Sequence, residues 1–521
     1  MSARALVAGL PRSALHAGAT AACVASLSSL VCGPAAAQLI SIKTVPVAEG
    51  DQFGFLPSMN LGMAGVSIAL ADTLLDPFGN PAKASRLHKT YAFGAPSFYS
   101  VSSNAGSGRT LPLGGFAQRG SSFAGFALAL QEVSGPRRDE VSPPIAFADA
   151  SSVSVATTAF PSTPRTRTNQ YAVAMLGRSI PESKLSLAAS VFWSGLSAID
   201  GVDLLYAGSQ NIKQFGQAVD FRVGMLKEWT GDQSLEAVLV HNRFAMTHDV
   251  MYLDPFWDPT LRQTLPRARL EHNPDRTNTW GLHLQYERPL VDSTRRIGGI
   301  FTANRMSHPK IPNYEIMNIP RDPGYSSAFN VGVGVSETDG PVTFGLDAIL
   351  EPIWSHTWAD AAAPTATSGG AMLPAGAKTI ENRFNFMNAI LRAGLSRDFK
   401  LDASESRVRI QGGLQLRAIS YHLDQYSHVL EAGREQDESW SEWTYTFGTS
   451  LRFPELEVHY RWRATTGTGR PGLAGPQFGN RVDLQLAASG GRNFLVAPAG
   501  DLALTPVRVT THQFSVSVPL R

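Results

Sequence analysis

The sequence predicts an all-β fold, a transmembrane antiparallel β-barrel of about fourteen strands, with sixteen as the alternative, closed around an N-terminal hatch. Three observations predict it. Apolar and polar residues alternate from residue 91 onward, long and short connections alternate between these segments, and residues 53–87 do not alternate. We therefore divide the chain into a signal peptide at 1–37, an extension and hatch at 38–90, and the barrel at 91–521.

The first 37 residues have the pattern of a secretory signal. Arg4 and Arg12 form a basic start, a small-residue and apolar stretch covers 13–31, and three alanines at 35–37 precede Gln38. A lipid anchor at Cys32 is a weaker alternative, because the bulky Val31 stands where a small residue is usual. We expect Sec-type export to the outer membrane of a Gram-negative-type bacterium.

Composition excludes several classes of protein. Both cysteines, Cys23 and Cys32, lie in the signal, so disulfides cannot stabilise the mature chain. Removing Arg4 and Arg12 leaves 43 basic residues against 43 acidic ones, a balance that does not suggest a nucleic-acid partner. No later stretch approaches the roughly 18 consecutive apolar residues of a membrane helix.

The clearest alternating segment is 455–464. Leu456, Val458, Tyr460 and Trp462 point to one face, and the residues between them are Glu457, His459 and Arg461. In a soluble sandwich the apolar face would be the core. In a membrane barrel it would meet lipid, and the polar face would line the lumen.

The connections favour the barrel. Long ones are expected at 132–168, 197–214, 247–276, 307–325, 355–381, 422–438 and 465–480. Between them lie short turns at 181–183, 231–232, 289–293, 337–340, 398–404 and 454. Outer-membrane barrels segregate short turns to one side and long loops to the other. Trp193, Trp229, Trp354 and Tyr445 stand near segment ends, as interfacial aromatic girdles do.

The pattern leaves the strand count open between fourteen and sixteen. Candidate strands begin near residues 91, 110, 122, 169, 184, 217, 234, 277, 296, 327, 342, 383, 407, 443, 455, 483 and 509. Their number is odd, whereas a bacterial barrel with both termini on one side needs an even number. Segments near Thr110, Asp483 and Val509 are the weakest, which leads to the count of fourteen or sixteen.

Residues 53–87 are rich in glycine and alanine and contain Asp76-Pro77 and Asn80-Pro81. Proline fixes φ and extends the residue before it, so this stretch is expected to form a compact, kinked plug. Asp72 and Asn80 are expected to hydrogen-bond the backbone of its turns, as short polar side chains do.

This stretch resembles the start of the FadL family, outer-membrane transporters of long-chain fatty acids and other hydrophobic compounds. The resemblance rests on Leu61-Gly62, the small residues through Gly65, 69–72 with Asp72, and Asn80-Pro81-Ala82. It implies a fourteen-stranded barrel and an inward-folded hatch, in which Gly62, Gly65, Asp72, Asn80, Pro81 and Ala82 serve gating. The extension at 38–52 and the ending Pro519-Leu520-Arg521, without a terminal aromatic, depart from the family pattern.

An uptake channel for a fatty-acid-like ligand implies a ligand path. Loop residues 250–257, with Phe256 and Trp257, and 316–319 offer apolar surface for capture or for packing between loops. Phe53, Phe55 and Leu56 are candidates to line an inner pocket or to anchor the plug on the wall. Arg461 and Arg463 could hold a ligand carboxylate, or could pair with lumenal or hatch acids.

Signals for catalysis are poor, and we expect no enzyme, no catalytic residue, no cofactor and no metal site. Residues 467–472 fit GxGxxG but stand in a loop, and no HExxH or cysteine pair occurs in the mature chain. The sequence favours passive, hatch-gated uptake of a hydrophobic small molecule by a barrel in contact with outer-membrane lipid. The alternative is a non-transporting barrel that acts as scaffold for a secretion or surface-attachment complex.

Overall fold

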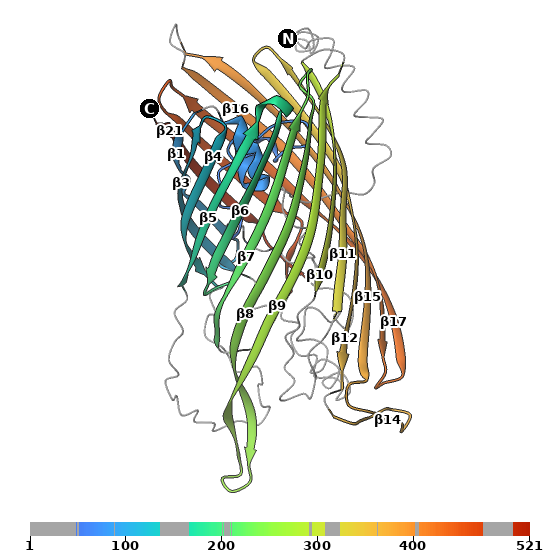
Figure 1. Cartoon of the computed structure of the whole chain (residues 1–521). Helices are drawn as coiled ribbons and strands as arrows, with labels where there is room; N and C mark the ends of the chain where they lie inside the picture. The colour runs from blue at the N-terminus through green and yellow to red at the C-terminus, as the bar shows by residue number, and fades with distance from the viewer. Residues whose placement is uncertain are drawn as a thin grey trace, which may run out of the picture.

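A computed structural model describes residues 48–520 apart from 49, 51, 88, 136–165, 201, 203–208, 210, 291–293, 308–323, 362, 402–405 and 472–503. The signal at 1–37 and the candidate strand near Asp483 lie outside the described residues. The described chain forms one tall antiparallel barrel with a short N-terminal segment inside it (Figure 1).

The barrel wall is a single closed sheet. β1 (Tyr91–Gly94) and β2 (Ser97–Val101) both pair with β3 and with β21, so they are two halves of one interrupted wall strand. The other wall strands are β3 (Gly106–Arg119), β4 (Ser122–Ser134), β5 (Thr166–Ile180), β6 (Leu185–Leu196), β7 (Asn211–Glu228), β8 (Ser234–Asp258), β9 (Gln263–Pro289), β10 (Arg295–Ser307), β11 (Gly324–Asp339), β12 (Val342–Asp360), β15 (Lys378–Lys400), β16 (Arg407–Ser427), β17 (Ala432–Arg452), β18 (Glu457–Thr466) and β21 (Val509–Pro519).

Among the described residues the wall has sixteen strands when β1 and β2 are counted as one, so the alternative count of sixteen holds and fourteen was too low. The weak candidates near Thr110 and Val509 are full wall strands, β3 and β21. The barrel closes where Tyr91 of β1 stands opposite Pro519 of β21. Two small hairpins lie outside the wall sheet, β13 (Thr365–Ala366) with β14 (Met372–Leu373), and β19 (Gly469–Pro471) with β20 (Leu504–Pro506).

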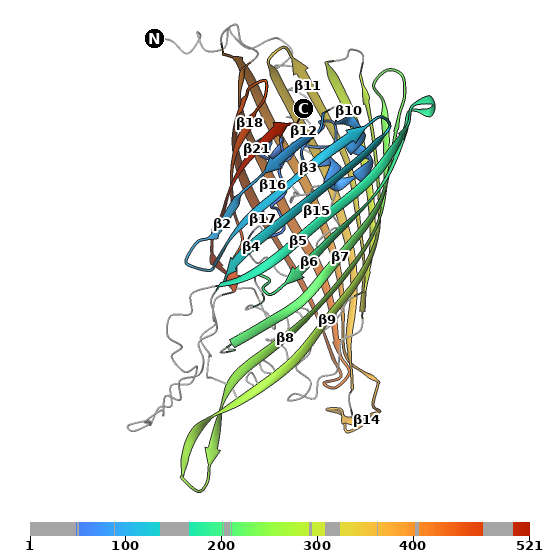
Figure 2. The ribbon, with the colours of Figure 1, turned by 60° about the vertical axis from the view of Figure 1, so that its left-hand side comes forward.

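We call the end with Tyr91 and Pro519 the turn end and the opposite end the loop end. Two of the expected long loops, 247–276 and 422–438, are instead strand hairpins: β8 and β9 run to Asp258 and Gln263, and β16 and β17 to Ser427 and Ala432. Cross-strand backbone pairing extends them where the sequence is too polar to read as strand. The β8–β9 hairpin projects furthest at the loop end (Figure 2). The tight turn at 102–105 also lies at the loop end, against the expected segregation.

The two faces of the wall have opposite character. On β9, Trp280, Leu282 and Tyr286 are exposed on the outside, whereas His283 and Gln285 between them are buried toward the lumen. A soluble sandwich would bury its apolar face and expose its polar one. An exposed apolar outside around a polar lumen is the surface of a transmembrane barrel. None of the helices in the described part of the chain is long and apolar enough to cross a membrane.

The N-terminal segment (residues 52–87) lies inside the barrel toward the turn end (Figure 1). It contains η2 (Leu61–Met63), α2 (Asp76–Gly79) and η3 (Pro81–Arg86), each only one or two turns long. On one side η3 packs against β4 to β7, and on the other η2 packs against β15 to β18. The segment thus reaches across the lumen to opposite parts of the wall.

Candidate functional site

Asp72 is the centre of the N-terminal segment. Its buried carboxylate accepts hydrogen bonds from Ser58 Oγ (2.6 Å) and from the backbone N–H groups of Met59 (2.8 Å), Asn60 (3.0 Å), Leu74 (3.2 Å) and Leu75 (3.0 Å). The side-chain amide of Asn60 donates in turn to the carbonyls of Val66, Leu70 and Ala71. These two side chains tie three turns together, since the segment has little regular backbone pairing of its own.

Asn80 joins the segment to the wall. Its Oδ1 accepts from the N–H of Ala82 at 3.1 Å, and its Nδ2 donates to the Met225 carbonyl and to Glu236 Oε2, both at 3.2 Å. The following Pro81 starts η3, where a missing N–H costs nothing. Ala82 is fully buried. The Asn-Pro-Ala triplet therefore docks η3 on β7 and β8.

Buried charges reinforce this side. Lys83 Nζ lies 3.0 Å from Asp76 Oδ2 and 2.8 Å from Glu236 Oε1. Burial raises the pKa of Asp76 to about 6, although the positive charge of Lys83 acts against that rise. Arg86 adds ion pairs to Glu228 and Glu287 of the wall, at 2.9 and 3.5 Å. Charges of the segment and the wall are thus matched across this contact.

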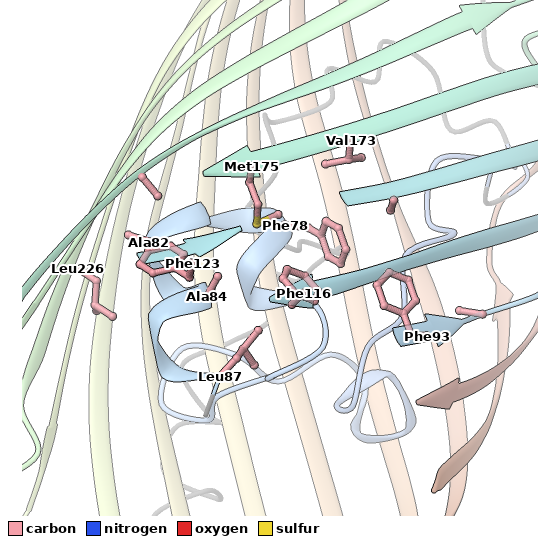
Figure 3. Close-up of a cluster of buried hydrophobic side chains, with 13 residues drawn as sticks. Phe78, Ala82, Ala84, Leu87, Phe93, Phe116, Phe123, Val173, Met175 and Leu226 are labelled. Atoms are coloured by element: carbon pink, nitrogen blue, oxygen red, sulfur yellow. The ribbon is translucent and has the colours of Figure 1, made fainter. Parts of the chain in front are cut away.

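An apolar cluster completes the attachment to β1–β7 (Figure 3). The Phe78 ring lies 5.9 Å from the Phe93 ring and 5.3 Å from the Phe116 ring, both in edge-on geometry. Ala82, Ala84 and Leu87 of the segment pack in the same cluster with wall residues Phe123, Val173, Met175 and Leu226.

The opposite side is held differently, by wall side chains that bond to the backbone of the segment. Asp347 accepts from Ser67 N at 2.8 Å, and Arg392 Nη1 donates to the Gly65 carbonyl at 3.1 Å. Thr446 Oγ1 accepts from Ala64 N (2.9 Å) and donates to Gly62 O (3.0 Å). Further donors are Gln285 to Ile68 O, Ser336 to Ala69 O, Arg461 to Met59 O and Gln513 to Leu56 O.

Wall glycines allow this close approach. We call them the glycine seat: Gly224, Gly298, Gly334, Gly345, Gly394, Gly413 and Gly448. A Cβ on any of them would meet an atom of the N-terminal segment, at 2.1 Å for Gly224 with Asn80 Oδ1 and 2.4 Å for Gly413 with Ala64 N. In return, a Cβ on Gly62 would lie 2.8 Å from Gly448 Cα. Gly65 has φ +70°, the left-handed region that glycine adopts most readily.

A cavity of about 300 Å³ remains between the N-terminal segment and the wall. It brings together six of the residues singled out by sequence: Phe53, Leu56, Gly65, Asp72, Asn80 and Arg463. Val66 and Ile68 of the segment and Ile300 and Ile349 of the wall contribute apolar surface, and charged and amide side chains line the rest. This volume is at the lower end of the range for small-molecule pockets.

Other predicted residues lie elsewhere. Phe55 is only 2% exposed and packs on the Tyr171 ring at 4.6 Å, an anchoring position. Arg461 bonds to Met59 O and to His459 Nδ1. The backbone of Phe256 and Trp257 belongs to β8 at the loop end, and their side chains lie outside the described part of the structure.

The sequence reading missed a lumenal apolar cluster on β11, β12 and β15–β17. Its members are Ala328, Ile353, Phe384, Phe386, Ile419, Tyr421 and Leu423, with Trp440 packed against them. Ile353 stands opposite Phe386, and Phe386 opposite Tyr421, across adjacent strands. On the same strands, Ile349 stands opposite Ile390 nearer the N-terminal segment, where both pack with Ile68 and Ile300. The sequence signal for this cluster was the presence of apolar residues on both faces of the segment 384–391, where a wall strand would normally have one polar face.

Lys83, Glu236, Asp347 and Arg392, which secure the N-terminal segment, were also missed. Nothing local marks them, because each acts through a partner distant in sequence. Within the described ranges, no three His, Asp or Glu side chains gather where they could hold a metal ion.

No known family model matches the chain, and no curated protein matches it. Its fold aligns with a FadL homologue of Pseudomonas aeruginosa over 92% of this chain and 100% of that one, at 10% identity and TM-score 0.45. The toluene transporter TbuX of Ralstonia pickettii aligns at 9% identity and TM-score 0.38, over 90% and 100% of the two chains. The toluene transporter TodX of Pseudomonas putida aligns at 10% and 0.36, over 91% and 99%.

The FadL homologue comes from the family that residues 53–87 resemble. The strand pairing of this chain itself defines the closed barrel.

Proposed function

We propose that this protein is an outer-membrane channel for passive uptake of a hydrophobic small molecule, with the N-terminal segment acting as a hatch. One observation carries the proposal: two apolar clusters lie on the lumenal face of β11, β12, β15 and β16, separated by the polar row of Asn330, Glu351 and Asn388, and they mark a path to the cavity beside the segment. Lumenal faces of membrane barrels are ordinarily polar, so a cluster of apolar and aromatic side chains there supports the passage of an apolar molecule, although its members are at most 3% exposed and must part to admit one.

The path suggests an order of events. A hydrophobic molecule captured at the loop end would pass over the lumenal apolar cluster, of which Phe386 and Tyr421 form the centre. It would then enter the cavity between Ile349 of the wall and Phe53 and Leu56 of the segment. Release toward the turn end requires the hatch to shift, which gives Gly62, Gly65, Asp72, Asn80, Pro81 and Ala82 their gating role.

A fatty-acid-like cargo is the class that the family resemblance suggests. Arg463 lines the cavity and would supply a positive charge for a carboxylate, with Arg461 nearby on the same strand. Phe256 and Trp257, on the projecting β8–β9 hairpin, are proposed as part of the capture surface. Sec-type export directed by residues 1–37 would bring the chain to the outer membrane, where lipid surrounds it.

The alternative, a scaffold for a secretion or surface-attachment complex, has its own supporting observation. Lys83 and Arg86 pair with Asp76, Glu228, Glu236 and Glu287, which seals the β7–β9 side of the hatch with matched charges. A barrel sealed in this way all round would not conduct, and would be expected to copurify with protein partners.

A disulfide lock tests the hatch. A Cβ built on Gly345 lies 3.4 Å from Val66 Cβ, near the roughly 3.5–4.5 Å of disulfides, and the chain has no cysteine beyond residue 32. Cells that express Val66→Cys/Gly345→Cys are given a hydrophobic naphthylamine dye that fluoresces in membranes. We expect oxidation to slow dye entry to the rate of cells without the protein, and dithiothreitol to restore it. Equal rates in both states would refute hatch gating.

A second pair of variants tests the path. Phe386→Gln places an amide in the lumenal apolar cluster, whereas Met387→Gln changes the next residue, which faces outward. We expect slower dye entry only for Phe386→Gln. Equal rates of dye entry in the two variants would contradict the path. If the wild-type protein admits no dye and copurifies with other proteins in stoichiometric amounts, the scaffold function is favoured instead.

A further inference from the structure

The outer face of β8, β9 and β10 has a well-defined apolar band. Leu239, Leu282 and Phe301 are 50%, 40% and 40% exposed there, and Trp280 marks the edge of the band toward the loop end. Exposed tryptophan at such an edge is typical of the boundary between hydrocarbon and lipid headgroups.

Three arginines stand just beyond this edge. Arg243, Arg276 and Arg305 are the first outward residues of β8, β9 and β10 past the band that carry a permanent charge. Arg243 stands opposite Asn278 of β9, Arg276 is the next outward residue after Asn278, and Arg305 stands opposite Trp280. Adjacent strands are about 4.8 Å apart and outward neighbours on one strand about 6.8 Å apart, so the Cα atoms of Arg243 and Arg276 are about 8 Å apart and those of Arg276 and Arg305 about 14 Å apart, a spread that one lipid with two phosphate groups can span.

No described carboxylate stands directly opposite any of them in the strand register. Their outward neighbours on the paired strands include Ala245, Asn278 and Ser327. In the described part of the chain none of the three forms an ion pair, whereas the outward Arg109 and Arg295 pair with Glu132 and Glu337. Arg305 lies 4.0 Å over the Tyr325 ring and donates to Ser327 Oγ at 2.7 Å, contacts that hold its charge in place without neutralising it.

A depression of the outer wall adjoins the cluster. It has a volume of about 360 Å³, and Trp193, Phe215, Ala245 and Arg276 are among the residues that line it. Aromatic side chains supply apolar surface for an acyl chain, and Arg276 supplies a charge at the same place. Charge and apolar surface thus meet at the depth where lipid headgroups lie.

We propose that Arg243, Arg276 and Arg305, with the adjoining depression, bind the phosphate groups of an anionic membrane lipid in the leaflet at the loop end. Guanidinium groups bind phosphate oxygens through paired, charge-assisted hydrogen bonds, and Arg is better suited to this than Lys. An amphipathic lipid satisfies both parts of the site, phosphate on the arginines and acyl chain on Trp193 and Phe215. This site faces away from the lumen and does not depend on the proposed uptake function.

The test measures binding of fluorescent bis-phosphorylated lipid A to the full-length mature protein in dodecyl maltoside micelles. The variant is Arg243→Gln/Arg276→Gln/Arg305→Gln. The matched control, Arg288→Gln/Arg397→Gln/Arg407→Gln, removes the same charge from exposed arginines at the turn end. The gel shift of folded against heated barrel verifies that both variants are folded.

We expect the affinity of the variant to fall about a hundredfold, since each basic residue at a membrane surface contributes about 1 kcal/mol. The control variant should bind lipid A with the affinity of wild type. Added salt should weaken the binding of lipid A to wild type. Dephosphorylated lipid A should bind wild type only as weakly as intact lipid A binds the triple variant. Unchanged affinity in the variant, an equal loss in the control, or undiminished binding of the dephosphorylated lipid would each overturn the site.

Discussion

Gly413 offers a sharp test of how the N-terminal segment is seated. In Gly413→Ala the new Cβ would lie 2.4 Å from Ala64 N and 2.5 Å from Met63 C. Ordinary carbon contacts are about 3.5–4.0 Å, so the segment must move by about 1 Å. The bonds of Thr446 Oγ1 with Ala64 N (2.9 Å) and Gly62 O (3.0 Å) would then exceed hydrogen-bond length.

Two lost hydrogen bonds at about 1 kcal/mol each, and about 1 kcal/mol of overpacking, weaken docking of the segment by about 3 kcal/mol. Amide hydrogen exchange of the peptide that contains Ala64 and Ser67 should therefore accelerate about a hundredfold. Gly412→Ala is the matched control, because its Cβ faces outward with nothing within 4 Å. If the two variants exchange alike, the segment is not seated on this glycine and the close-packing reasoning is wrong.

Two further predictions concern the polar contacts of the segment. Asp72→Ala removes the acceptor of five hydrogen bonds, so we expect the free energy of local unfolding of the segment to fall by about 3–5 kcal/mol. The same hydrogen-exchange experiment measures this change. Unchanged exchange would contradict the central role of this carboxylate. Lys83→Met leaves Asp76 and Glu236 buried without their cation and should destabilise by about 3–5 kcal/mol in thermal unfolding. Adding Glu236→Gln should recover part of that loss, and a further loss instead would show that Lys83 does not act through Glu236.

The barrel could be predicted from sequence because its signal is repeated along the wall. In β18, for example, Val458, Tyr460 and Trp462 lie on the outward face of the wall. His459 and Arg461, which alternate with them, lie on the lumenal face. Strand ends were less predictable. The polar residues 432–438 belong to β17 because β16 supplies backbone partners from Tyr421 to Ser427, and no local pattern records such pairing.

The interior of the site was predictable only in part. Asn80 and Asp72 could be chosen because their chemistry is local: Asn80 caps η3, and all the hydrogen-bond donors to the Asp72 carboxylate lie within 14 residues of it. The partners of the segment on the wall, such as Asp347 and Arg392, lie about three hundred residues away in sequence. The glycine seat could not be predicted for the same reason. The role of a glycine in a strand depends on which other backbone packs against it, and the sequence of the strand does not specify that partner.

The contacts that attach the N-terminal segment to the wall differ in strength on its two sides. This difference indicates where the segment would first separate from the wall to let a molecule pass. Toward β7 and β8, Lys83 lies between Asp76 and Glu236, and breaking such a buried pair leaves a charge that costs about 3–5 kcal/mol. Toward β12 and β15, the attachments are hydrogen bonds to the backbone of the segment, such as that of Ser67 with the Asp347 carboxylate, worth about 1.5–3 kcal/mol each because the wall partner is charged.

Opening should therefore begin on the weaker side, with the segment turning about its charged and aromatic anchor. That side carries Ile349 and Ile390, and beyond them the lumenal apolar cluster. A small shift of Val66 to Ile68 away from the wall would open the cavity toward that cluster while every ion pair of Lys83 and Arg86 stays intact. The paired charges that favour a scaffold would then be compatible with the proposed uptake, because they would form the hinge of the proposed hatch and not its opening edge.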